Sequence, residues 1–208
     1  LQEKIHLYDA AATSYRKAVE LNPKHYESRY LLGMTQIRLG GLEEARRSLQ
    51  AAVEIKPDDV RGHLALGEVY EKLGERHLAE SSLRRVAQMS PNNFVAQVNL
   101  GLLLIDNKQY HEAIATLTKA SALEPKNSRV WSALGRAELE LGETGPAESH
   151  LRHAIELDGS NAYAHNNLGV LLQRLGKRDE ARQEFKTALG LNPDLEVARK
   201  NLDVVGDE

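Results

Sequence analysis

The sequence contains no cysteine, which excludes disulfide bonds, thiol nucleophiles and cysteine-bound zinc. Proline is sparse, with six among 208 residues, and aromatic residues make up 5% of the chain. No apolar run reaches the roughly 18 residues that a membrane-spanning helix needs, so we expect no transmembrane segment. The start of the chain also lacks a signal-peptide pattern. It begins with leucine rather than methionine, and we therefore expect a fragment of a longer protein.

The sequence also has no large excess of positive or negative charge. The chain has 27 lysine and arginine residues against 30 aspartate and glutamate residues, a net charge of −3, and the two signs are interspersed. We therefore expect no basic surface of the kind that binds nucleic acid. Alanine, leucine, glutamate and arginine dominate, and this composition favours helices over strands.

A period of 34 residues runs through the whole chain. The dipeptide Leu-Gly follows it at Leu32-Gly33, Leu66-Gly67, Leu100-Gly101, Leu134-Gly135 and Leu168-Gly169. Alanine keeps the same step at Ala11, Ala45, Ala79, Ala113, Ala147 and Ala181, and proline keeps it at Pro23, Pro57, Pro91, Pro125 and Pro193. Such registration along a full chain is typical of stacked structural repeats.

Each period contains two helical patterns, and segment 162–195 illustrates them. Apolar residues recur at spacings of three and four at Ala164, Leu168, Leu171, Leu172 and Leu175, and again at Ala181, Phe185, Ala188 and Leu189. Gly176 after the first pattern and Pro193 after the second are typical helix stops. Polar residues suited to helix capping precede the first helix of successive units at Asp59, Asn93, Asn127 and Asn161. The sequence therefore predicts an all-α fold of antiparallel helix pairs.

Small residues recur where the two helices of a pair are expected to cross. When each unit is numbered from 1, glycine of the Leu-Gly dipeptide occupies position 8 and the recurring alanine occupies position 20. A large side chain at either position would overpack the crossing, at a cost of roughly 1–3 kcal/mol. We therefore expect close helix contact at these positions.

The pattern resembles the tetratricopeptide repeat family, whose 34-residue unit carries Trp, Leu-Gly, Tyr, Ala, Phe, Ala and Pro in that order. Matching residues are Trp131, Leu134-Gly135, Ala147, Leu151 and Ala154 in one unit, Tyr70 in another and Phe185 in a third. The resemblance implies a right-handed α-solenoid, the superhelix of this family. It divides the chain into the tail of a preceding repeat (1–25), five repeats (26–59, 60–93, 94–127, 128–161 and 162–195) and a partial capping helix (196–208).

Some positions depart from the family pattern. Arg29, His63, Gln97 and His165 replace the tryptophan, and Gln36 and Glu138 replace the tyrosine. These changes predict weaker local packing in the first and fourth units. Asn107-Lys108 replaces the usual Leu-Gly at one helix end, so we expect that end to be looser.

The first helix of each unit has two faces. Positions 3, 4, 7, 10, 11 and 14 form the packed face, and positions 2, 5, 6, 9, 12 and 13 form the opposite one. The resemblance implies that this opposite face lines a concave groove where a peptide or protein partner binds. The predicted partner-binding residues are Tyr30, Met34, Ile37, Val95, Val98, Asn99, Leu102, Ile105, Arg129, Arg136, Asn166 and Asn167. The apolar residues among them form a patch, and three occupants are compatible with it: a partner, a helix outside this chain, or a second copy.

Asn166 and Asn167 raise a separate question, because asparagine is a weak helix former. Asn99 and Asn167 share position 6, and an amide there can grip an extended peptide backbone regardless of its sequence. The superhelical repeats of O-GlcNAc transferases are similar, with an asparagine ladder at this position. Ordinary surface polarity explains the pair equally well. The carboxylate clamp of chaperone-binding family members is absent, because positions 5 and 9 lack its lysine and asparagine pattern.

No catalytic constellation, metal site or cofactor site is predicted. His150 and His153 lie three residues apart without a nearby cysteine or carboxylate to complete a metal site. We therefore predict a non-enzymatic, cytoplasmic scaffold that binds a protein or peptide partner and assembles a complex. Two alternatives stay open: a self-associating scaffold, and the recognition arm of a larger enzyme such as a glycosyltransferase.

Overall fold

The computed structural model describes residues 2–206, which form twelve α-helices and no strand. The predicted all-α fold is therefore confirmed, and residues 1, 207 and 208 of the predicted terminal segments lie outside the described part. The helices are α1 (Gln2–Leu21), α2 (Tyr26–Leu39), α3 (Leu42–Ile55), α4 (Val60–Lys72), α5 (Arg76–Met89), α6 (Phe94–Asp106), α7 (Tyr110–Leu123), α8 (Ser128–Leu141), α9 (Thr144–Leu157), α10 (Ala162–Arg174), α11 (Arg178–Leu191) and α12 (Glu196–Gly206).

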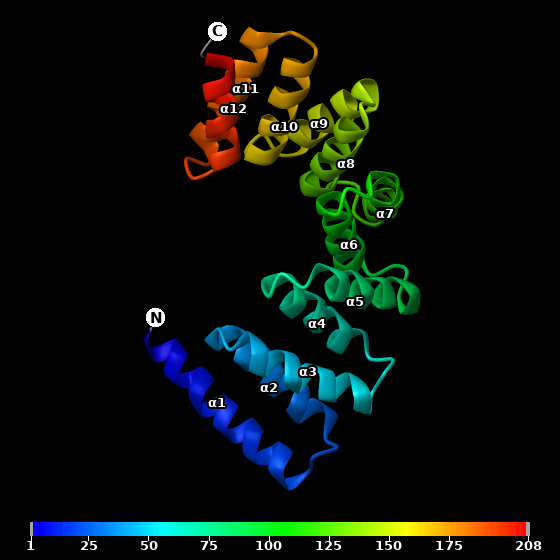
Figure 1. Cartoon of the computed structure of the whole chain (residues 1–208), viewed down its shortest axis with the longest axis vertical. Helices are drawn as coiled ribbons and strands as arrows, with labels where there is room; N and C mark the ends of the chain where they lie inside the picture. The colour runs from blue at the N-terminus through cyan, green and yellow to red at the C-terminus, as the bar shows by residue number, and fades with distance from the viewer. Residues whose placement is uncertain (1, 207–208) are drawn as a thin grey trace. The chain divides into compact units, whose positions relative to one another are not determined.

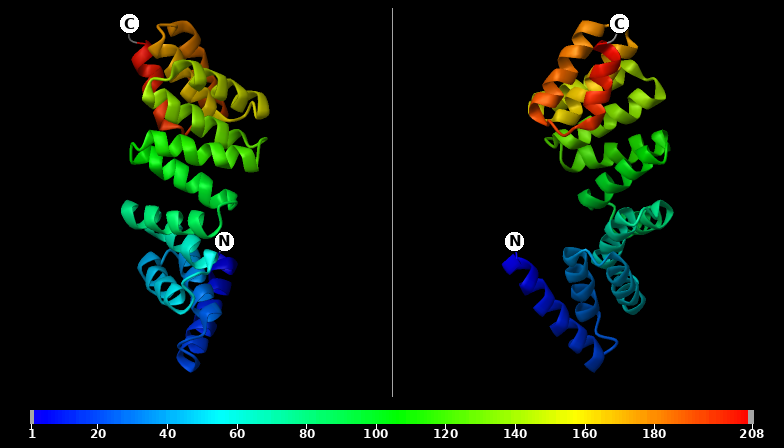
Figure 2. Two further views of the ribbon diagram at one scale, coloured as in Figure 1. Left: turned by 90° about the vertical axis from the view of Figure 1, so that its right-hand side faces the viewer. Right: turned by 60° about the vertical axis from the view of Figure 1, so that its left-hand side comes forward.

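The chain divides into two compact units, residues 1–96 and 97–208, with the boundary inside α6. In the first unit each helix from α1 to α5 packs against the next. In the second unit the helices from α7 to α12 do the same, and α10 also contacts α8 and α12 (Figure 1). Figure 2 shows the consecutive pairs from two further directions. Each unit is thus a stack of helical hairpins, the arrangement of an α-solenoid.

Left-handed backbone ends most of the first helices. Gly40, Gly74, Gly142 and Gly176 all have φ between 75° and 82°. After α8, the Gly142 N–H donates to the carbonyls of Glu138 and Leu139, which closes the last turn. Lys108 occupies the equivalent place after α6 and is the one described non-glycine residue with positive φ, at 60°. A residue with a Cβ is strained in this region by roughly 1–2 kcal/mol.

Replacing Lys108 by glycine should therefore stabilise the protein. We expect the free energy of unfolding to rise by about 0.5–1 kcal/mol, because relief of strain exceeds the entropy that glycine adds to the unfolded chain. Thermal unfolding followed by circular dichroism measures the change. The control is Lys119→Gly on the exposed face of α7, which should lower stability by about 1 kcal/mol. A lower melting temperature for Lys108→Gly would show that its backbone is not strained.

The glycine at position 8 determines how closely the two helices of a pair approach. An ideal Cβ built on Gly33, Gly101, Gly135 or Gly169 would lie 2.5–2.6 Å from a side chain of the partner helix. That side chain is at position 24 of the repeat. Those side chains are Leu49, Leu117, Leu151 and Phe185. The recurring alanines Ala45, Ala79, Ala113, Ala147 and Ala181 are fully buried. The predicted close crossing is confirmed. The structure also shows that the missing Cβ of the glycine makes room for the side chain at position 24.

Where arginine or histidine replaces tryptophan at position 4, the hydrogen bond of the tryptophan is kept. The Nε1–H of Trp131 donates to the carbonyl oxygen of Pro125 over 2.7 Å. The same bond to the residue at position 32 is made by Arg29 to Pro23 (2.6 Å), His63 to Pro57 (2.8 Å) and His165 to Gly159 (3.2 Å). Tryptophan, arginine and histidine all carry a planar N–H donor, so one replaces another without leaving the carbonyl unsatisfied.

Position 11 is compensated in a similar way. Gln36 accepts a hydrogen bond from the Ser48 hydroxyl over 2.7 Å, and Glu138 lies 2.8 Å from Nδ1 of His150. Both partners lie on the second helix of their pair, at position 23 of the repeat. Loss of the family tyrosine therefore replaces an aromatic contact with a polar one that is satisfied inside the hairpin.

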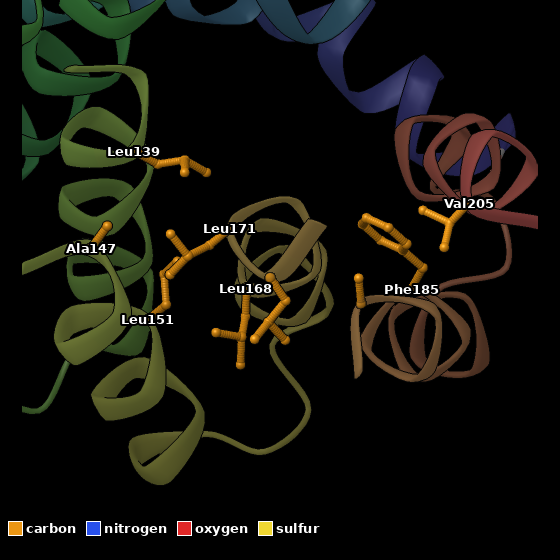
Figure 3. Close-up of a cluster of buried hydrophobic side chains, with 9 residues drawn as sticks. Leu139, Ala147, Leu151, Leu168, Leu171, Phe185 and Val205 are labelled. Carbon is orange, nitrogen blue, oxygen red and sulfur yellow. The ribbon is translucent and has the colours of Figure 1, made fainter. Parts of the chain in front are cut away.

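One hydrophobic core lies in the second unit, where α10 packs between its neighbours. Leu151 of α9 is directed toward Leu168 and Leu171 of α10 (Figure 3). On the other side Phe185 of α11 lies beside Val205 of α12. Phe185 and Leu171 have no exposed surface. Burial of one helix by helices on both sides is the packing that a repeat stack requires.

Candidate binding pocket

A pocket of about 1060 Å³ opens on the second unit. Most of its helical residues come from three first helices, α6, α8 and α10, and one comes from the end of α11. The loops before α8, α10 and α12 contribute the rest, and we call it the α6–α8–α10 pocket. Its lining consists of Leu102, Asp106, Lys126, Asn127, Ser128, Arg129, Ser132, Ala133, Arg136, Asp158, Ser160, Asn161, Ala162, Tyr163, Asn167, Leu191 and Asn192.

The two faces of α8 show how the sequence creates this surface. Arg129, Ser132 and Arg136 line the pocket, at positions 2, 5 and 9. Val130 and Leu134, at positions 3 and 7, are buried on the other side. The helical period of 3.6 residues separates these two sets, because residues three and four apart share a face.

Four of the predicted partner-binding residues line this pocket together: Leu102, Arg129, Arg136 and Asn167. Leu102, Arg136 and Asn167 are half-buried, and Arg129 is exposed. Asn99 is also half-buried but does not belong to the lining.

Three other predicted residues require correction. Val98, Ile105 and Asn166 are 5%, 2% and 4% exposed, so the structure does not present them on an open surface. Val98 and Asn166 share position 5 with Ser132, which is also buried. At this position the next first helix can cover the side chain: Asn201 of α12 donates a hydrogen bond to Asn166 over 3.0 Å. Packing of α12 on α10, which the period of one helix does not describe, contributes to the burial of Asn166.

The remaining predicted residues belong to the first unit. Tyr30, Met34 and Ile37 are half-buried on α2, and Val95, at the start of α6, is 54% exposed. Tyr30 stacks on Tyr26 with ring centroids 6.0 Å apart, and burial raises the pKa of Tyr30 above its usual value.

Arg61 lies over the Tyr30 ring at 5.0 Å. Its guanidinium is held by Glu27 and Asp59, each at 3.1 Å. Hydrogen bonds from Arg61 hold the pKa of the Asp59 carboxyl below its usual range, against the opposing effect of its own burial. These carboxylates engage the guanidinium, so this cluster stabilises the first unit and offers a partner little free charge.

The two asparagines of α10 have different roles. The Asn166 amide links α10 to α12 through Asn201 and donates to Oδ1 of Asn167 over 3.3 Å. The Asn167 side chain lines the pocket, and its own amide N–H groups have no acceptor in the described part of the chain. Asn166 therefore joins helices, while Asn167 has donors available for a ligand.

Fixed charges in the pocket are unevenly compensated. Arg136 pairs with Asp106 over 2.9 Å. The Asp158 carboxylate accepts hydrogen bonds from the backbone N–H of Ser160 (2.9 Å) and from its hydroxyl (2.6 Å), and these hold the Asp158 pKa below its usual range. Lys126 and Arg129, in contrast, have no ion pair or hydrogen bond among residues 2–206.

Several lining residues were missed by the sequence analysis. Tyr163 occupies position 2 of its repeat, as Arg129 does, and could have been found by applying the same face to α10. Lys126, Ser160 and Asn192 lie in the connections between repeats. Helical periodicity carries no signal for loop residues, so these could not be found in that way.

No group of three or more histidine, aspartate or glutamate residues within the described part of the chain could hold a metal ion. His150 and His153 instead flank the Trp131 ring, with centroids 5.2 and 5.0 Å away. No described helix combines the length and apolarity needed to cross a bilayer.

These features define a protein built from stacked helical hairpins with a pocket on its first helices. Profiles of the family described as Tetratricopeptide repeat match residues 6–69, 70–137 and 104–153, and a second such profile matches 162–195. The chain belongs to the tetratricopeptide repeat family. Among curated protein sequences none matches the chain significantly.

Solved structures with the same fold include proteins of low sequence identity. YrrB, described as a TPR protein with an unusual peptide-binding site, is 21% identical over 91% of this chain and 97% of its own, with a TM-score of 0.75. MamA from Desulfovibrio magneticus RS-1 is 23% identical over 89% of this chain and 97% of its own, with a TM-score of 0.73. PilF from Pseudomonas aeruginosa is 24% identical over 96% and 90%, with a TM-score of 0.66. These likenesses concern the fold.

Proposed function

We propose that the protein is a non-enzymatic interaction scaffold whose α6–α8–α10 pocket binds an extended peptide segment of a partner protein. The observation that carries the proposal is the meeting of Leu102, Asn167 and Tyr163 in one open pocket of about 1060 Å³. That volume is at the upper end of the roughly 300–1,000 Å³ typical of small-ligand sites. It is large enough for a short stretch of peptide.

The lining supplies both kinds of contact that an extended chain needs. Asn167 offers free amide donors, which suit peptide carbonyls of any sequence. Leu102, Leu191 and the Tyr163 ring offer apolar contact for side chains, and Tyr163 is 60% exposed. The peptide-binding site named for YrrB, which shares the fold, supports the same use here. We further propose that the predicted repeats 26–59 to 162–195 form the scaffold, flanked by α1 and α12.

Replacing Leu102 by arginine tests the proposal. We expect at least a ten-fold loss of affinity, because a charged side chain would occupy the apolar part of the pocket and would have to be desolvated on binding. The probes are peptides selected by the wild-type protein from a phage-displayed library of random linear sequences, with affinity measured by fluorescence anisotropy.

The matched control is Val204→Arg, at a side chain of α12 that is 62% exposed and outside the pocket. It should bind the same peptides as the wild type, and both variants should keep the helical circular dichroism spectrum. Failure to select any peptide, or equal binding by Leu102→Arg, would refute the proposal. Light scattering distinguishes the competing scaffold, since a self-associating protein would show a mass that rises with concentration.

A further inference from the structure

The lining of the α6–α8–α10 pocket includes two cationic side chains that pair with no described carboxylate. Lys126 and Arg129 are both exposed and both line the pocket. Of the arginines described between residues 97 and 206, Arg129 alone has neither an ion pair nor a hydrogen bond. Arg136, Arg152 and Arg174, for comparison, each pair with a carboxylate of the same unit.

The acidic residues of the pocket are already engaged elsewhere. Asp106 is bound by Arg136, and Asp158 is bound by both donors of Ser160. No described carboxylate lies within 4.0 Å of the Lys126 or Arg129 side-chain nitrogens. Among the described residues, therefore, no carboxylate pairs with Lys126 or Arg129, and both side chains are available to a ligand.

The start of α8 adds to this charge. Its N-cap residue, Asn127, makes no side-chain capping bond and instead donates its amide to Glu124 over 3.0 Å. The first turn of α8 contains no acidic residue. The first turn of α8 therefore supplies no acidic partner to the positive end of its helix dipole, and the Glu124 carboxylate of the preceding loop lies 3.0 Å from the Asn127 amide.

A second, independent feature of the same helix suggests a ligand. Ser132, one turn further along α8, is only 4% exposed, and the pocket is where its remaining surface lies. Its hydroxyl has no hydrogen-bond partner in the part of the chain that the structure describes. Because Ser132 lines the pocket, its hydroxyl is placed to donate to a group bound there.

From these features we infer that the partner peptide is acidic: an aspartate or glutamate side chain of the peptide is bound by Lys126 and Arg129 at the start of α8. The inference rests on the proposed function and adds the chemical class of the ligand. The site differs from the clamp of the chaperone-binding members considered above, because Arg129 is at position 2 and Lys126 lies in the preceding loop. The ligand class follows from charge complementarity between a carboxylate and these two cations.

The test uses the full chain and the same library of random linear peptides. Peptides selected by the wild type should be enriched in aspartate and glutamate relative to the unselected library. Selection on the double variant Lys126→Gln/Arg129→Gln should lose that enrichment. Selected acidic peptides should bind the double variant about 3- to 20-fold more weakly, because each exposed ion pair contributes modestly. The difference should shrink at high ionic strength.

The control double variant is Lys119→Gln/Lys186→Gln, which removes the same charge from exposed positions of α7 and α11 outside the pocket. It should keep both the enrichment and the affinity. Peptides that bind without acidic enrichment, or enrichment that both double variants lose equally, would overturn the inference and leave the proposed function standing. If the wild type selects no peptide, the proposed function and this inference are both refuted.

Discussion

Replacing Phe185 by alanine should lower the free energy of unfolding by about 3–5 kcal/mol. Phe185 has no exposed surface, and its ring carbons lie 2.6–3.0 Å from the place where Gly169 would carry a Cβ. The same side chain belongs to the core that joins α10, α11 and α12. Alanine would leave a cavity that these helices can close only partly, so the loss includes a cavity contribution.

The loss of stability caused by Phe185→Ala should be confined to the helices around the substituted residue. In a repeat stack each repeat contacts only its neighbours, so hydrogen exchange should rise in α10–α12 and stay unchanged in α2–α4. The control is Phe185→Leu, since leucine occupies the equivalent place at Leu49, Leu83, Leu117 and Leu151. It should cost less than about 1.5 kcal/mol. A uniform rise of exchange along the chain would contradict the repeat-by-repeat description.

Replacing Ala113 by leucine should lower the free energy of unfolding by about 1–3 kcal/mol. Ala113 lies on α7 with no exposed surface, at the crossing with α6. A Cβ on Gly101 of α6 would already lie 2.5 Å from Leu117, so no space is left between the two helices for a larger side chain. The added carbons would force the two helices apart or push side chains out of their preferred rotamers.

The matched control is Ala115→Leu, two residues further along α7, where the alanine is exposed. Alanine and leucine are both good helix formers, so this change should alter stability by less than about 0.5 kcal/mol. Thermal unfolding of both variants, followed by circular dichroism, gives the comparison. An unchanged midpoint for Ala113→Leu would show that α6 and α7 do not cross at this residue.

The candidate site was only partly predictable. The helical period correctly placed Arg129, Arg136 and Leu102 on the side of their helices that faces the pocket. It could not show that Asn166 is covered, because the covering helix α12 follows in the next position of the stack. Loop residues such as Lys126 and Asp158 follow no period.

The sequence by itself determined the repeat length, the helical hairpin and the small residues at its crossing. These depend on contacts between residues less than one period apart, such as Gly135 with Leu151, and a local pattern is enough to specify them. Only the tertiary structure decided which side chains of the first helices remain accessible. It also showed that Arg29, His63, Trp131 and His165 make the same hydrogen bond, and that the charge of Arg129 is unpaired. Both depend on distances between helices and loops, and these are set when the hairpins stack.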